Sequence, residues 1–190
     1  MPLIHLPIQS GSNKILTAMN RKHTVEEYFE VIKKIIKVKP DIKFSSDFII
    51  GYPSETYDDF KKTLQIMSKI KFINSFSFIF SARPGTPAFN LNIIDEKVSR
   101  DRLIEFQQTA ANIKTDYRKK LVNKTAKVLF ENKMKSGNKY FGRDEYFNSV
   151  IVESKNNLTG KIKNVKILKV NQNTLFGDIV PNLNQTDHAA

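Results

Sequence analysis

Short apolar runs alternate with longer segments of helical periodicity along the first two thirds of the chain. The runs predict strands at residues 3–8, 42–50 and 72–81. The segments that follow carry apolar residues three or four positions apart, and they predict helices over residues 24–39, 56–70 and 99–121.

Two of these helices carry start signals in the sequence. Thr24 stands three residues before Glu27, and Thr56 stands three residues before Asp59. Such pairs form capping boxes, in which each side chain bonds the backbone N–H of the other residue. Pro40 ends the first helix, because proline cannot continue the hydrogen-bond ladder.

Strand–helix units in series predict a parallel sheet with right-handed crossover connections. After about Thr125 the pattern changes to short strand-like segments separated by Gly/Asn turns, which predict a small all-β domain, a barrel or OB-like sheet. The predicted organisation is an α/β domain at residues 1–123, a β-barrel domain at residues 124–182 and a disordered tail at residues 183–190.

Composition favours a folded chain and excludes several classes of site. Hydrophobic residues make up 40% of the 190 residues, which is enough for a core. The chain has no run of 18 apolar residues and no signal-peptide pattern at its start, so we predict no membrane span and no signal peptide. It has no cysteine, which excludes disulfides, thiolate metal sites and thiol nucleophiles.

The net charge of +12 suggests a polyanionic partner, most obviously nucleic acid. A second explanation fits the total equally well, because the excess is almost all lysine and Ile, Asn and Lys are abundant, as A+T-rich coding DNA would produce. The distribution favours the first explanation, since residues 114–143 hold ten Lys or Arg against two acids, Asp116 and Glu131.

Loops at three strand ends are candidates for ligand binding. In parallel α/β folds ligands bind at the carboxyl ends of the strands. Here those ends are residues 9–12, 51–56 and 81–87, each with glycine and either small hydroxyls or a charge. Ordinary turn and capping chemistry explains any one of these loops by itself. Three such loops at one end of a sheet favour a ligand site, although their spacing alone does not identify the ligand.

The sequence shows no catalytic or metal-binding constellation. His5 and His23 lack a His, Cys or carboxylate neighbour at ligand spacing, so both are predicted to be structural. Asp58 and Asp59 are most simply helix-start acids that the helix dipole favours. We predict no catalytic residue and no metal ligand in this chain.

Three stretches resemble the radical-SAM methylthiotransferases, namely HLPIQSGSNKILTAMNRKHT, SSDFIIGYPSET and FSFIFSARPGTPAF. The last third, with VLFE, FGRD and TLFGD, resembles the TRAM β-barrel with which such enzymes hold tRNA. The likeness is greatest to the bacterial enzymes that add a methylthio group to isopentenylated adenosine beside the anticodon. It implies a cytoplasmic protein that contains the C-terminal part of a partial TIM-type barrel, which binds S-adenosylmethionine, followed by a TRAM barrel.

The resemblance also implies cofactor-binding residues. Asp47-x-Ile49-x-Gly51-x-x-x-Glu55 stands where the family carries G-x-I-x-G-x-x-E, with Asp47 in place of the first glycine and one more residue before the glutamate. In the family the backbone of this stretch packs against adenine, and Glu55 helps to fix the loop. The other expected contacts with S-adenosylmethionine come from the remaining strand ends, at Gln9, Ser10, Ser81, Arg83, Gly85 and Thr86.

One departure from the family is large. The family needs six cysteines for two [4Fe–4S] clusters, and this chain has none, so it holds no cluster ligand. Two hypotheses of different class follow. The chain is either the C-terminal part of a methylthiotransferase whose N-terminal half is encoded separately, or a non-catalytic RNA-binding remnant of that enzyme; a remnant without function is a third reading.

The barrel is expected to bind tRNA through the basic segment. The expected RNA-binding residues are Lys127, Lys133, Lys135, Lys139, Tyr140 and Arg143. Tyr140 and Phe141 lie together in this segment, and a ring exposed there can stack on an unpaired base. The alternative, that one or both rings fill the barrel core, stays open at this point.

Overall fold

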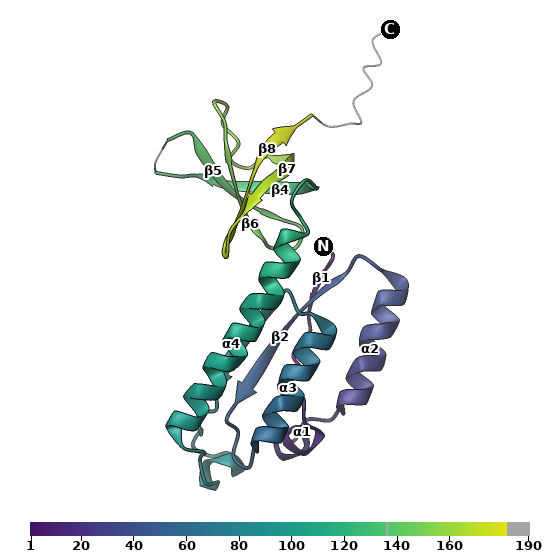
Figure 1. The fold of residues 1–190 in the computed structure, drawn as a ribbon, viewed down its shortest axis with the longest axis vertical. Helices are drawn as coiled ribbons and strands as arrows, with labels where there is room; N and C mark the ends of the chain where they lie inside the picture. Colours follow the sequence, from purple (N-terminus) through teal and green to yellow (C-terminus); the bar gives the residue numbers. More distant parts are fainter. Residues whose placement is uncertain (136, 182–190) are drawn as a thin grey trace. The chain divides into compact units, whose positions relative to one another are not determined.

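The computed structural model describes residues 1–135 and 137–181, so the predicted tail at 183–190 lies outside the described residues. The chain forms two compact units, one of residues 2–114 and one that begins at Thr115 (Figure 1). The division falls within helix α4 (Glu96–Lys119), whereas the sequence pattern placed it at residue 123. No helix among the described residues is long and apolar enough to cross a membrane.

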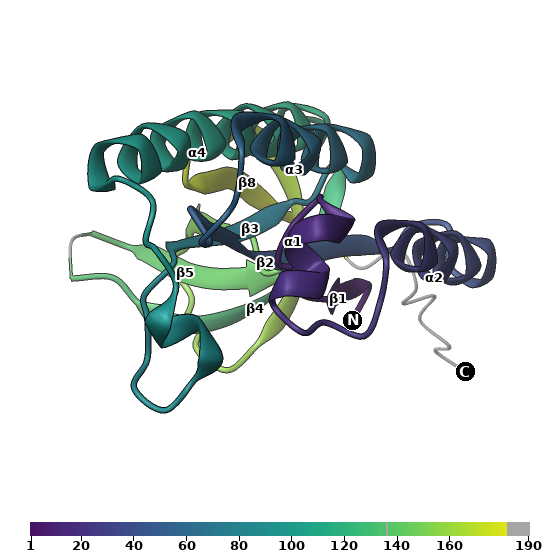
Figure 2. The same cartoon turned by 90° about the horizontal axis from the view of Figure 1, so that it is seen from below.

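The first unit is built on a parallel sheet, as the strand–helix series predicts. Its strands, in the spatial order β1-β2-β3, are β1 (Leu3–His5), β2 (Lys43–Ile50) and β3 (Asn74–Ile79). The predicted helices are α2 (Val25–Val38), α3 (Tyr57–Ile70) and α4. Helices α3 and α4 lie over one face of the sheet (Figure 2).

Both predicted capping boxes are present. Thr24 accepts from the backbone N–H of Glu27 at 3.2 Å, and Thr56 accepts from that of Asp59 at 3.2 Å. Two short elements were not predicted, the helix α1 (Asn13–Ala18) and the 3-10 helix η1 (Pro87–Asn90). Neither is long enough to show a hydrophobic period, so the pattern carries no signal for them.

Alternate residues of β2 divide the sheet into a core face and a second face. Phe48 is fully buried, and its ring centroid lies 5.6 Å from that of Phe72 and 4.8 Å from that of Phe106 on α4. The second face carries the exposed rings of Phe76 and Phe78, which pair in register with Asp47 and Ile49 of β2. The phenylalanines of β3 therefore point away from the helices.

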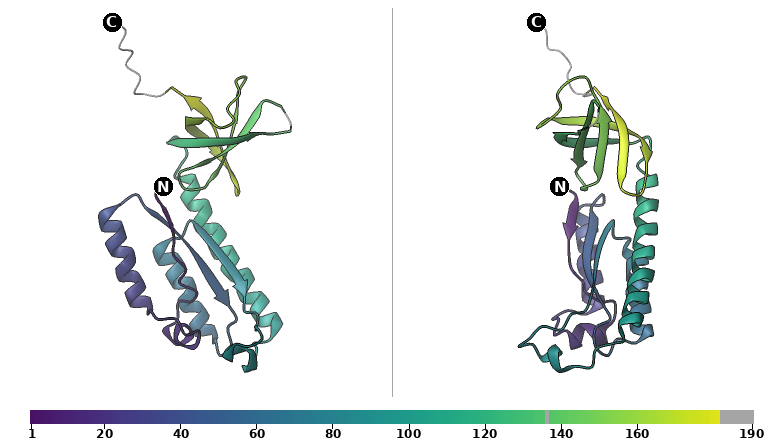
Figure 3. Two further views of the ribbon diagram at one scale, coloured as in Figure 1. Left: turned by 180° about the vertical axis from the view of Figure 1, so that it is seen from behind. Right: turned by 90° about the vertical axis from the view of Figure 1, so that its left-hand side faces the viewer.

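The second unit contains the predicted β-barrel, which is closed (Figure 3). The strands follow the order β4-β5-β6-β8-β7 around the barrel, and they are β4 (Thr125–Lys133), β5 (Lys139–Asp144), β6 (Ser149–Glu153), β7 (Ile162–Val170) and β8 (Thr174–Val180). A Cβ at Gly142 would meet the carbonyl oxygen of Leu129 at 2.4 Å, and one at Gly177 would meet that of Lys166 at 2.1 Å. Only glycine allows the strands to approach so closely there.

The C-terminal end of α4, from Thr115 onwards, belongs to the barrel unit. Leu121, just beyond the helix, contacts the barrel core. Arg118 is buried and donates from Nη1 to the carbonyl oxygen of Gln172. Burial raises the pKa of Asp144 nearby, against hydrogen bonds from the side chain and backbone of Asn148.

Candidate functional site

A groove lies where the carboxyl ends of the three parallel strands meet. Its volume is about 850 Å³, within the range of about 300–1,000 Å³ typical of small-molecule sites. Polar and apolar side chains line it together, from β2 and β3, from the end of α1 and from the segments that follow the strands.

Six of the ten residues expected at the cofactor line this groove, and they are Gln9, Asp47, Ile49, Ser81, Arg83 and Thr86. The lining also includes residues that are not among the ten expected ones, for example Arg21, Tyr52, Phe78 and Phe80. Tyr52 and Phe80 form an edge-to-face ring pair with centroids 4.9 Å apart.

The four other expected residues lie outside the lining. Ser10 is buried, and its Oγ accepts from the backbone N–H of Ser12 at 3.2 Å. Gly85 stands in an exposed loop with φ +79°. Gly51 and Glu55 form the turn after β2, where their polar groups bind each other.

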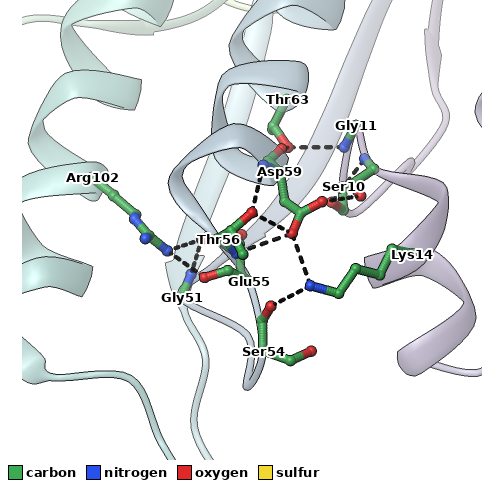
Figure 4. Close-up of polar contacts among 11 residues, drawn as sticks. Ser10, Gly11, Lys14, Gly51, Ser54, Glu55, Thr56, Asp59, Thr63 and Arg102 are labelled. Atoms are coloured by element: carbon green, nitrogen blue, oxygen red, sulfur yellow. Dashed lines mark hydrogen bonds and ion pairs between the residues drawn. The ribbon is translucent and has the colours of Figure 1, made fainter.

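The buried carboxylate of Glu55 holds that turn (Figure 4). Its Oε1 accepts from the backbone N–H of Gly51 at 3.1 Å and from Nη1 of Arg102 at 2.8 Å. Arg102 also donates to the Glu55 carbonyl oxygen at 3.1 Å. Burial raises the pKa of Glu55, while these hydrogen bonds and the charge of Arg102 act to lower it.

Asp59 connects the first and second strand-end loops, which is more than a helix-start acid does. Its carboxylate accepts from Ser12 Oγ at 2.7 Å and from Lys14 Nζ at 3.2 Å, besides the Thr56 cap (Figure 4). Lys14 also donates to the Ser54 carbonyl oxygen at 2.8 Å. Burial alone would raise the pKa of Asp59, but the hydrogen bonds outweigh it and hold that pKa well below its usual range.

Gly51 is required by both conformation and space. Its φ is +72°, in the left-handed region that favours glycine, and an added Cβ would lie 2.5 Å from Ser99 Oγ and 3.0 Å from Ser99 Cβ on α4. The turn after β2 and helix α4 therefore fit together only with glycine at this position.

Replacing Gly51 by alanine is expected to destabilise the protein by more than the roughly 1–2 kcal/mol of left-handed strain, because the clash with Ser99 adds to it. Gly85→Ala is the matched control, since its φ of +79° imposes similar strain with nothing within 4 Å. In a double-mutant cycle measured by urea denaturation, Ser99→Gly should recover the excess cost of Gly51→Ala. Equal costs for the two alanine variants, or no coupling with Ser99, would contradict the clash.

His5 and Asp47 lie side by side although they are far apart in sequence. The Nε2 atom of His5 is 3.4 Å from Asp47 Oδ2, and Nδ1 is 2.9 Å from Ser45 Oγ. The pairing of β1 with β2 brings Asp47 beside His5, a contact that spacing along the sequence does not reveal. Within the described ranges no three His, Cys, Asp or Glu side chains form a possible metal site.

Five of the six expected RNA-binding residues are exposed on the barrel unit, and they are Lys127, Lys133, Lys135, Lys139 and Arg143. Arg143 Nε lies 3.1 Å from Glu131 Oε1, and Lys139 Nζ lies 3.7 Å from Glu153 Oε1. Tyr140 is the exception. It is 4% exposed and belongs to the barrel core, so its ring is not available for stacking on a base.

Comparison with known proteins identifies both units. Residues 1–67 match the Radical SAM superfamily, and residues 119–180 match the TRAM domain. The chain therefore combines part of a radical SAM domain with a TRAM domain. Nearly the whole chain is also similar in sequence to the C-terminal part of longer curated proteins.

The curated relatives carry the name tRNA-2-methylthio-N(6)-dimethylallyladenosine synthase. The chain is 55% identical over 179 residues to the protein of Pelagibacter ubique, 44% over 180 residues to that of Wolbachia pipientis wMel and 44% over 184 residues to that of Orientia tsutsugamushi. These alignments cover 93–96% of this chain but only 40–41% of the relatives. The chain thus spans about two fifths of the length of the curated relatives it matches.

The two cofactors that the family implies fit this chain differently. S-adenosylmethionine fits the groove, whose lining offers the charged groups Arg83 and Asp47 and the aromatic ring of Phe78. A [4Fe–4S] cluster does not fit, because such clusters are held by cysteine thiolates and the chain has no cysteine.

Proposed function

We propose that the chain is the C-terminal part of a tRNA-modifying methylthiotransferase that acts on isopentenylated adenosine next to the anticodon. The observation that carries this proposal is the combination of a ligand-sized groove at the strand ends with a cationic TRAM barrel, in a chain 55% identical to a relative of that name. The cysteines that would hold the clusters of such an enzyme lie outside these 190 residues. The proposed place of action is the cytoplasm.

In this proposal the groove holds part of the S-adenosylmethionine site. Arg83 supplies a positive charge for the carboxylate of the methionine moiety, and Asp47 supplies a negative charge for its ammonium group. Ile49 and the ring of Phe78, which both line the groove, provide the surface for adenine. Glu55 and Arg102 act through the turn that they hold.

The second candidate function is a non-catalytic RNA-binding protein. The observation that favours it is the lack of any cysteine, together with the charge of the barrel unit. Residues 115–181 hold 14 Lys or Arg against six Asp or Glu, so about a third of the chain carries most of the net charge of +12. Both candidates require the barrel to bind tRNA.

Replacing Lys133, Lys135 and Lys139 by alanine is expected to weaken tRNA binding and to flatten its salt dependence. Each phosphate contact contributes about 0.7–0.9 to the slope of log K against log salt, so three lost contacts reduce the slope by up to about 2–3. The measurement is an anisotropy titration of the full chain with tRNA at several salt concentrations.

The matched control is the triple variant Lys33→Ala, Lys34→Ala, Lys37→Ala, which removes the same charge from exposed positions on α2. It should leave affinity and slope nearly unchanged. Equal effects in the two triple variants would place the RNA surface elsewhere, and no tRNA binding by the unmodified chain would overturn both candidate functions.

A further inference from the structure

A row of apolar side chains crosses three neighbouring strands on the outside of the barrel. Phe141 of β5 pairs in register with Ile151 of β6, and Ile151 pairs with Phe176 of β8. Lys169 of β7 pairs in turn with Phe176 and ends the row with a cation. Phe141, Ile151 and Phe176 are called the aromatic row below.

The alternation of buried and exposed residues along the three strands shows that the aromatic row faces outward. Its neighbours along each strand are buried in the barrel, and they are Tyr140, Gly142, Val150, Val152, Leu175 and Gly177. Because successive residues of a strand point to opposite faces, the row itself points to the surface. Its three side chains are partly exposed, and Lys169 is exposed.

Arg143 and Lys169 place cations beside the aromatic row, whereas Glu153 of β6 and Asp178 of β8 lie two residues along their strands on the side away from Arg143. The Arg143 guanidinium lies over the Phe141 ring, 5.4 Å from its centroid, and Glu131 holds that guanidinium at 3.1 Å. On the side of Arg143 the next positions in register are the small hydroxyl residues Ser149 and Thr174. This surface thus combines flat apolar rings with positive charge and with room beside them.

We propose that the aromatic row is a stacking platform for unpaired bases of RNA, with Arg143 and Lys169 neutralising the adjacent phosphates. Aromatic rings flanked by cations are the arrangement by which barrel folds bind single strands, because every base has a π-face and every nucleotide a phosphate. This inference rests on the proposed function and adds to it the kind of RNA segment that the barrel takes. A protein ligand is the competing occupant, and the excess of cations in residues 115–181 favours RNA.

The test uses the full chain and a labelled single-stranded RNA of about ten nucleotides, within the roughly 4–16 nucleotides that one OB fold covers. The same RNA annealed to its complement and an abasic version of the same backbone are the comparison probes. The variants are Phe141→Leu and Phe176→Leu, which keep apolar area but remove the π-face. Phe147→Leu is the control, since Phe147 is 47% exposed and lies outside the row.

Each row variant should weaken binding of the single strand by about fivefold or more, since stacking contributes roughly 5- to 150-fold per base. The salt slope should stay unchanged, because a phenyl ring neutralises no phosphate. Duplex binding and the Phe147→Leu variant should change less than about twofold. The unmodified chain should bind the abasic probe more weakly than the intact single strand by a comparable factor. This comparison does not depend on the folding of any variant.

The outcomes separate this proposal from the one on which it rests. If both row variants and the abasic probe bind as tightly as their references, the platform is overturned while tRNA binding by the barrel stands. Equal losses on duplex and single strand would also overturn it. If the unmodified chain binds no RNA, the proposed function fails together with it.

Discussion

Replacing Arg102 by methionine is expected to destabilise the α/β unit by about 3–5 kcal/mol, which is the usual cost of removing one partner of a buried ion pair. Methionine keeps most of the length of the side chain but leaves the buried Glu55 carboxylate without its cation. The Arg102 and Glu55 side chains are only 10% and 1% exposed, so water cannot take over the lost contact. The turn at Gly51, which depends on Glu55, should loosen as well.

The matched control is Arg100→Met on the same helix. Arg100 pairs with Glu96, but both side chains are more than two thirds exposed, so this pair should contribute at most about 1 kcal/mol. The measurement is urea denaturation followed by circular dichroism. A cost for Arg102→Met as small as that for Arg100→Met would show that the buried pair does not hold the turn.

The loss of unfolding free energy in Arg102→Met, relative to the unmodified chain, should depend on pH in a defined direction. Burial already raises the pKa of Glu55, and losing Arg102 raises it further because the cation favours the charged form. The folded variant then takes up a proton at a higher pH than the unfolded chain, whose Glu pKa is about 4.3. The stability deficit relative to the unmodified chain is therefore complete above the folded Glu55 pKa of the variant, and it shrinks as the pH falls from there towards the raised Glu55 pKa of the unmodified chain.

Local patterns were enough to predict the fold. The capping boxes at Thr24 and Thr56 and the five barrel strands all depend on residues close together in sequence, and all are present in the structure. The short helix α1 was missed because six residues complete fewer than two turns and show no period.

The candidate site was predicted only in part, because its supporting contacts join distant residues. Arg102 reaches Glu55 across 47 positions, and Ser12 reaches Asp59 across 47 positions. Periodicity along one element cannot reveal a partner on another element. The same limit explains Tyr140, since two adjacent aromatic residues on a strand must point to opposite faces but the sequence does not say which one faces the core.

Reconstitution of the purified chain with iron and sulfide is expected to form no [4Fe–4S] cluster, and strong reductant is expected to release no 5′-deoxyadenosine from S-adenosylmethionine. The reason is chemical, because cluster assembly needs thiolate ligands and the chain has no cysteine. The measurements are iron content, visible absorbance and product analysis after anaerobic reconstitution. The control is the same procedure with a full-length relative, which should gain iron and absorbance. A cluster spectrum from the chain alone would contradict this expectation and would show that other side chains ligate the iron.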